Sequence, residues 1–168
     1  MPAFCVSKKN SVAVLAAVCL AGCSSLPPVS STSILPGATL QEVLSRFGNP
    51  AAIQVLPGGK RLQYSTQPAG QTAVMVDLNT DDKVTSARQV LNPTDFARVV
   101  PGQWTKDDIL REYGRPAAME RVGNWAGDIL VYRWLNVFDP MLFYVYLDAS
   151  QKVQQTGTGM EQRREPWK

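Results

Sequence analysis

"TLQEVLSRFGNP" (Thr39–Pro50) and "TKDDILREYGRP" (Thr105–Pro116) are two copies of one helical pattern. In each copy a Thr stands three residues before an acid, Glu42 or Asp108. This spacing predicts a capping box, in which the hydroxyl and the carboxylate accept from amides at the helix start. A glycine and then a proline close each copy, as expected where a helix ends. Two such segments in register indicate an internal repeat.

Apolar residues recur at helical spacing within both copies. They are Leu40, Val43, Leu44 and Phe47 in the first copy, and Ile109, Leu110 and Tyr113 in the second. From the alignment we expect Leu44 and Leu110 to occupy equivalent core positions beneath a sheet.

The repeat continues into segments that alternate apolar and polar residues. "GGKRLQYS" (58–65) corresponds to "WAGDILVYR" (125–133), and "VMVDLNTDDKV" (74–84) corresponds to "FYVYLDASQKV" (143–153). Alternation bounded by turn residues predicts strand–turn–strand units. The fold class is therefore predicted to be α+β, with two tandem modules that each pack a helical start on a short antiparallel β-meander.

The expected module boundaries are residues 34–91 and 92–158, followed by a loose tail at 159–168. The second module has a further helix signal, because Asn92 can cap a helix and Pro93 suits its first position. With 146 residues left after a 22-residue signal is taken from 168, the modules are expected to pack together rather than to form independent cores.

The amino terminus carries a targeting signal. Lys8 and Lys9 precede the apolar stretch "SVAVLAAVCLA", which is too short for a confident membrane span, and "LAGC" (Leu20–Cys23) follows. This pattern resembles a bacterial lipoprotein signal at 1–22, which implies cleavage before Cys23 and acylation of that residue. An ordinary signal peptide with an incidental Cys is the alternative.

A tether follows the expected lipid site. The segment 23–33 holds Cys23 and then "SSLPPVSSTS", a Ser/Pro/Thr stretch that could extend about 30 Å at most. Ser24 directly after the lipidated Cys resembles the sorting pattern for outer-membrane delivery. We therefore expect a lipid-anchored protein on the periplasmic face of the outer membrane, attached to its lipid through Cys23.

Charge and cysteine content narrow the function classes. Taking Lys8 and Lys9 from the 17 basic residues leaves 15 against 14 acidic ones, which argues against a nucleic-acid partner. Removing the signal also removes Cys5 and Cys19, so Cys23 would be the one cysteine left and no internal disulfide is expected.

Catalytic signatures are scarce. The sequence contains no His, the usual base of hydrolytic triads and the commonest metal ligand. The acidic pairs Asp81-Asp82 and Asp107-Asp108 are read as a hairpin turn and a first helical turn rather than as a metal site. We expect a protein that is not an enzyme and that uses neither a cofactor nor a metal.

The chain resembles the SmpA/OmlA (BamE-like) family of outer-membrane lipoproteins. The residues that carry the resemblance are the lipobox, "PGQWTKDDILREYGRP" (101–116), "LVYRW" (130–134) and "FYVYLDASQKV" (143–153). Two tandem copies are also similar to the β-lactamase-inhibitor-protein arrangement. The resemblance implies a role in cell-envelope or outer-membrane protein assembly and integrity through contacts with an envelope protein, such as the β-barrel assembly machinery. A tethered periplasmic inhibitor or ligand-binding module using its sheet surface is the alternative function.

The two modules differ on one face of their sheets. Strand alternation places Arg61, Gln63, Ser65, Met75 and Asp77 on the outer face of module one, as expected for a solvated surface. The corresponding face of module two is apolar, and carries Ile129, Val131, Arg133, Leu135, Leu142, Tyr144 and Tyr146. We predict partner binding there by Arg133, Tyr144 and Tyr146, with Ile129, Val131 and Leu142 around them. Cover by module one, the tether or the tail is the alternative.

Overall fold

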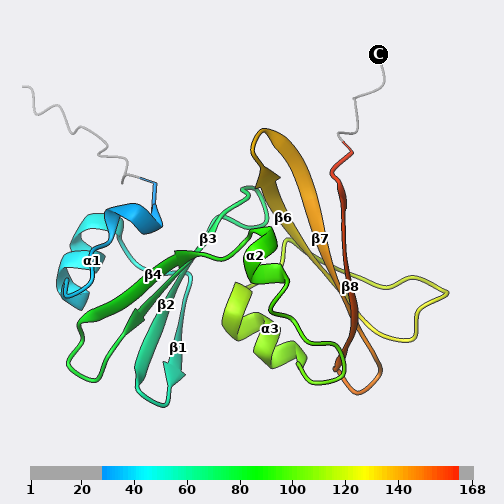
Figure 1. Ribbon diagram of the computed structural model, residues 1–168, viewed down its shortest axis with the longest axis horizontal. Coiled ribbons are helices and arrows are strands. Elements are labelled where there is room, and N and C mark those ends of the chain that lie inside the picture. Colours follow the sequence, from blue (N-terminus) through cyan, green and yellow to red (C-terminus); the bar gives the residue numbers. More distant parts are fainter. Residues whose placement is uncertain (1–27, 163–168) are drawn as a thin grey trace, which may run out of the picture.

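A computed structural model describes residues 28–162 of the chain, and these residues form two four-stranded antiparallel sheets with a helix before each (Figure 1). The predicted α+β class, with two tandem helix-and-meander modules, is confirmed. Cys23 and the first residues of the expected tether, 24–27, lie outside the described residues, as does the end of the tail from residue 163.

Module one begins with a short 3-10 turn at Ser31–Ser33. Its elements are α1 (Leu40–Phe47), β1 (Ala52–Leu56), β2 (Gly59–Ser65), β3 (Ala73–Leu78) and β4 (Val84–Gln89). The strands pair in chain order, β1-β2-β3-β4, which is the expected meander.

Module two has the additional helix that Asn92 and Pro93 predicted. Its elements are α2 (Pro93–Phe96), α3 (Lys106–Tyr113), β5 (Ala118–Glu120), β6 (Ile129–Asn136), β7 (Asp139–Leu147) and β8 (Val153–Met160). The strands again pair in chain order, β5-β6-β7-β8. β8 runs beyond Thr158, into the segment expected as a loose tail.

Both main helices begin and end as their sequences predict. The Thr39 and Thr105 side chains accept from the amides of Glu42 and Asp108, and both capping boxes are complete. Gly48 and Gly114 end the helices with φ of 76°, a value that favours glycine. The local chemistry of the repeat therefore accounts for the matching geometry of α1 and α3.

In each module, a buried tyrosine of the sheet forms a hydrogen bond with the end of the main helix. The Tyr64 hydroxyl donates to the Gly48 carbonyl at 2.9 Å, and the Tyr132 hydroxyl donates to the Gly114 carbonyl at 2.8 Å. Burial raises the pKa of both phenols, so each remains a protonated donor at neutral pH. The sequence alignment had paired Tyr64 with Tyr132, and the structure supplies the reason.

The helix positions that enter the cores differ from those expected. Val43 and Phe47 in α1, and Ile109 in α3, are buried, whereas Leu44 and Leu110 are only half-buried. The expectation that both leucines are core residues is therefore wrong. The buried residues define one stripe along each helix, and a leucine one position later lies to the side of that stripe.

The outer face of the first sheet is covered by α3 of module two. Gln63 Nε2 donates to the carbonyls of Leu110 and Arg111 at 2.9 and 3.0 Å. Arg61, only 6% exposed, donates through Nη1 to the Arg111 carbonyl at 3.2 Å. The expectation that Arg61, Gln63 and their neighbours form a solvated surface is wrong, because these side chains satisfy the last carbonyls of a helix from the other module.

The molecule is consequently a stack of layers. Figure 1 shows α1, the first sheet, α2 with α3, and the second sheet following one another along the long axis. Met75 and Ala73 of the first sheet belong to the same buried cluster as Ile109 and Tyr113 of module two. The two modules therefore share a core, as expected for a chain of this length.

Candidate functional site

The second sheet has a face turned away from α3, which we call the aromatic face. It holds the six residues predicted as a partner site: Ile129, Val131, Arg133, Leu142, Tyr144 and Tyr146. They face one another across β6 and β7 in the pairs Ile129↔Tyr146, Val131↔Tyr144 and Arg133↔Leu142. The structure thus brings all six together, and their binding role stays a prediction.

The two tyrosines of the aromatic face are more exposed than the aliphatic residues beside them. Ile129 and Val131 are each 4% exposed, whereas Tyr144 and Tyr146 are half-buried with ring centroids 6.3 Å apart. Burial, with smaller contributions from Glu120 and Tyr146, raises the pKa of Tyr144. A partner would therefore meet two aromatic rings, and the hydroxyl of Tyr144 is protonated at neutral pH.

Two glycines of β8 are the neighbours of Leu142 and Tyr144 across the sheet. Gly157 pairs with Tyr144, and Gly159 pairs with Leu142 on the same face. A Cβ on Gly159 would lie 3.5 Å from Cε2 of Tyr144, an ordinary van der Waals distance. The Tyr144 ring therefore extends over the backbone of an edge strand.

The loop between β5 and β6 borders the face at one end. Trp125 packs edge-on against Tyr146 with ring centroids 5.3 Å apart, and its Nε1 donates to the Leu147 carbonyl at 2.6 Å. The buried Asp128 holds the same loop, accepting from Arg121 at 2.7 Å and from Lys106 at 3.3 Å. The hydrogen bond from Arg121 is the main reason that the pKa of Asp128 is lowered.

Module one borders the face at the other end, through the loop between β2 and β3. Arg133 Nη1 donates to the carbonyls of Pro68 and Ala69 at 3.0 and 2.7 Å, and Nε lies 2.8 Å from a carboxylate oxygen of Glu161. Gln67 Nε2 donates to the Arg133 carbonyl at 2.7 Å, where β5 no longer pairs with β6. Arg133 is thus held by its own chain, so the covering that we considered as an alternative is realised at this residue.

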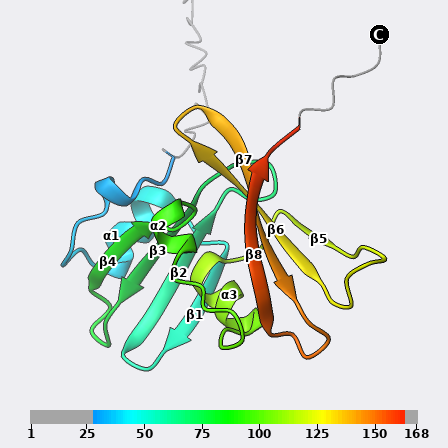
Figure 2. The ribbon, with the colours of Figure 1, turned by 45° about the vertical axis from the view of Figure 1, so that its right-hand side comes forward.

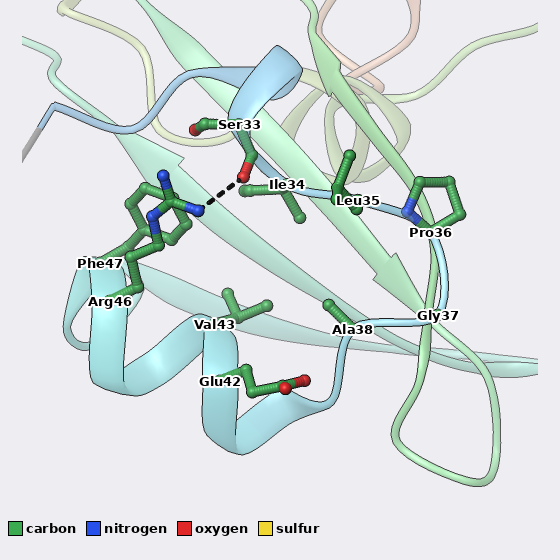
Figure 3. Close-up of a pocket in the computed structure, with 10 residues that line it drawn as sticks. All are labelled: Ser33, Ile34, Leu35, Pro36, Gly37, Ala38, Glu42, Val43, Arg46 and Phe47. Atoms are coloured by element: carbon green, nitrogen blue, oxygen red, sulfur yellow. Dashed lines mark hydrogen bonds between the residues drawn. The ribbon is translucent and has the colours of Figure 1, made fainter.

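The hollows elsewhere on the described chain include two that adjoin helices. The larger, about 410 Å³, lies between residues 33–38 and α1 (Figure 3). Its charged groups are already engaged, since Arg46 donates to the Ser33 carbonyl and Glu42 accepts from Thr39. The hollow therefore has few groups left to orient a ligand.

The second hollow, about 340 Å³, lies between α2 and β8. Phe96, Trp134 and Phe143 line it together with Thr156 and Thr158. Among residues 28–162, Trp134 Nε1 is buried without a hydrogen-bond partner. An indole N–H and two aromatic rings thus lie beside a free sheet edge.

The acidic pairs lie in the expected local structures. Asp82 is in the turn between β3 and β4 and forms an ion pair with Lys60 at 2.8 Å, whereas Asp108 belongs to the capping box of α3. In the part of the chain that the structure describes, no three His, Cys, Asp or Glu side chains gather as metal ligands would. Nor does any helix within residues 28–162 have the length and apolar character needed to cross a membrane.

Comparisons with known proteins correct the family assignment. No family model matches the chain, and no curated protein matches it. Among solved structures, it is similar to the DUF4309 family protein YjgB from Bacillus subtilis, at 14% identity over 74% of this chain and 79% of that chain, with a TM-score of 0.31. It is also similar to an extracellular protein containing a SCP domain from Bacillus anthracis, at 11% identity over 84% of this chain and 55% of that chain, with a TM-score of 0.30.

The SmpA/OmlA assignment is therefore wrong, since the matches found are to other proteins and no family model supports it. Its motifs were a capped helix, a glycine stop and aromatic strands, which many unrelated α+β repeats need for structural reasons. Both TM-scores are below 0.5, so neither similarity bears on function.

Proposed function

We propose that this protein is a lipid-anchored, non-catalytic binding module of the cell envelope that holds a partner protein on its aromatic face. The partner is an envelope protein with an apolar patch, and Tyr144 and Tyr146 are the main anchors. Interfaces favour Tyr because a large rigid ring packs while its hydroxyl stays hydrogen-bonded. Arg133 borders the contact rather than leading it, since Pro68 and Ala69 already hold its guanidinium.

The proposal rests on one observation, the difference between the corresponding outer faces of the two sheets. The outer face of the first sheet lies under α3, whereas no helix of residues 28–162 covers the aromatic face of the second sheet. An apolar sheet face on which no helix of the described chain packs, and whose two tyrosines keep part of their surface accessible, is typical of an interaction site.

The anchor is the second part of the proposal and rests on sequence. The Lys8–Lys9 pair, the short apolar stretch and "LAGC" support acylation of Cys23, and Ser24 supports delivery to the outer membrane with the module in the periplasm. Anchoring through Cys23 would confine the aromatic face to partners near that membrane. Mass spectrometry of the amino-terminal peptide, with C23S as the control, tests this part.

The partner site is tested by Y144S/Y146S. Envelope proteins are cross-linked in cells that carry the wild type or this variant, and the captured proteins are compared after gentle solubilisation. We expect the variant to lose its main cross-linked partner while its melting temperature changes little, because neither tyrosine belongs to the buried core clusters of the described residues.

I53S/V55S is the matched control. Ile53 and Val55 are 57% and 88% exposed on β1 of module one, so this variant also removes two surface hydrophobic residues. It should keep the partner. Capture unchanged by Y144S/Y146S, or lost equally in both variants, would contradict the proposed site.

A tethered inhibitor or ligand-binding module is the second candidate, and the hollow beside Trp134 favours it. An extended segment added to the free edge of β8 could place a side chain between Phe96 and Phe143. T156P would block such pairing at the edge while leaving Tyr144 and Tyr146 in place. Loss of the partner with T156P but not with Y144S/Y146S would support this candidate instead.

A further inference from the structure

The turn between β6 and β7 carries an unusual concentration of exposed apolar side chains. Val137 and Phe138 form the turn and are 74% and 87% exposed, while Leu135 beside them is 46% exposed. Met160, 72% exposed, ends β8 next to the start of β7, where it pairs with Met141. We call Leu135, Val137, Phe138 and Met160 the apolar tip.

The backbone of this turn does not need these residues. Asn136 pairs with Asp139, so two residues make the turn, a length that usually takes Asn and Gly because φ is positive. Val137 has φ of 57°, which is unfavourable for a β-branched residue. The chain therefore keeps an apolar pair where turn chemistry favours polar residues and glycine, which indicates a use outside the fold.

The apolar tip lies on the same side of the molecule as the first described residues. Figures 1 and 2 both show the β6–β7 turn, the first described residues and the end of β8 at the top of the view. Residue 28 is five positions after Cys23 in the sequence, so an acyl chain on Cys23 would enter a membrane close to this end. The tip and the proposed anchor can therefore meet the same surface.

The turns on the opposite side lack this apolar character. Figure 1 shows the β3–β4 turn and the β7–β8 turn at the bottom; the first carries Asp81, Asp82 and Lys83, and the second carries Asp148 and Lys152. Charged side chains of either sign are costly to bury in hydrocarbon, whereas exposed apolar side chains are not. Of these turns, the one in the apolar tip is therefore the one suited to enter a bilayer. Asp139 also lies at the tip, where its carboxylate would stay among the headgroups.

We propose that the apolar tip inserts into the bilayer that holds Cys23, as a second membrane contact that fixes the orientation of the module. This proposal rests on the acylation in the proposed function. A single flexible tether would let the module turn freely, whereas two contacts at one end would hold β6 and β7 upright on the membrane. The aromatic face, which lies on those strands, would then point along the membrane surface toward neighbouring envelope proteins.

Site-specific fluorescence tests this contact. The acylated protein is reconstituted into vesicles of phosphatidylethanolamine and phosphatidylglycerol, with and without bromine on the lipid acyl chains. F138W reports from the tip, and V55W is the matched control because Phe138 and Val55 are 87% and 88% exposed. Figure 1 shows the β6–β7 turn at the top and the end of β1, the strand that carries Val55, at the bottom. In brominated vesicles we expect F138W to lose most of the added indole emission, which should also move to shorter wavelength, whereas V55W should lose none.

Equal quenching of the two variants, or no quenching of F138W in protein that floats with the vesicles, would overturn the insertion of the tip. Emission of F138W that changes only after envelope proteins are added would overturn it as well, in favour of a protein partner at the turn. Failure of the chain to float with the vesicles would refute the anchor instead. Partner capture lost in Y144S/Y146S but kept in F138S separates the two surfaces.

Discussion

Gln63 should be essential for holding the two modules together, although its sequence position suggests only a polar residue on a solvated strand. Its side chain is 3% exposed, and its amide donates to the carbonyls of Leu110 and Arg111 at the end of α3. Q63L keeps the approximate volume of the side chain and removes both donors. It therefore tests the contact between the first sheet and α3 with little change in packing.

The magnitude follows from the two hydrogen bonds. Each contributes about 0.5–1.5 kcal/mol to stability. The Leu110 carbonyl still accepts from the Gly114 amide at 3.0 Å, and the Arg111 carbonyl still accepts from Arg61 at 3.2 Å, so neither carbonyl is left without a donor. We expect Q63L to lower the free energy of unfolding by about 1–3 kcal/mol, which corresponds to roughly 3–10 °C in melting temperature for a domain of this size.

Urea unfolding followed by circular dichroism and by tryptophan fluorescence measures this change. The described tryptophans, Trp104, Trp125 and Trp134, all belong to module two, whereas circular dichroism reports on both modules. Because the modules share a core, both signals should shift together in Q63L. Q155L is the control, since Gln155 is exposed on β8, and it should change stability by less than about 0.5 kcal/mol.

If Q63L is no more destabilising than Q155L, then the end of α3 is not held by the first sheet. If fluorescence stays at the wild-type midpoint while circular dichroism shifts, then the two modules unfold independently, and the stacked arrangement would not be a cooperative unit.

Further substitutions and pH test the repeat itself. I109A should lower the free energy of unfolding in urea by about 2–5 kcal/mol, because Ile109 is fully buried. L110A should lower it clearly less. The reverse order would support the helix register expected from sequence. Y132F should cost about 1–2 kcal/mol, since it leaves the buried Gly114 carbonyl without its donor, and an unchanged urea midpoint would show that this bond contributes nothing. In the folded chain, donors from Thr105 and Arg121 lower the pKa values of Asp108 and Asp128 from 3.8. The two carboxylates therefore contribute fully to folding stability above pH 3.8, and this contribution is lost as the pH falls below that value. Urea midpoints measured from neutral pH downward should therefore fall in acid, and less steeply in D128N.

The sequence was informative wherever structure depends on neighbours in the chain. A Thr three residues before an acid, a glycine after the last turn and a strand pattern of period two all act over short distances, and α1, α3 and both meanders formed as predicted. The inner residues of the first sheet also followed from alternation, since Leu62, Val76 and Leu78 are buried.

The sequence was misleading where contacts join residues far apart. Gln63 reads as a surface residue because nothing near it in the chain shows that Leu110 will supply carbonyls above it. Arg133 reads as a free anchor because its contact with Ala69 depends on how the modules stack. Polar residues that cap a distant helix and polar residues that face water give the same alternating pattern, so only the tertiary arrangement separates them.

The same positions also explain why another module of this kind would not pack on the second sheet. Arg61 and Gln63 of the first sheet supply the N–H donors that the end of α3 needs, and the aligned positions of the second sheet are Ile129 and Val131. Hydrocarbon at these positions would leave the carbonyl equivalent to that of Arg111 in another such helix buried without a donor, which costs about 1–3 kcal/mol. The aromatic face is therefore unsuited to a third module of the same kind and suited to a partner whose backbone groups are already paired. A folded envelope protein meets that requirement with an apolar patch, which is why the proposed partner is a protein surface rather than an added helix.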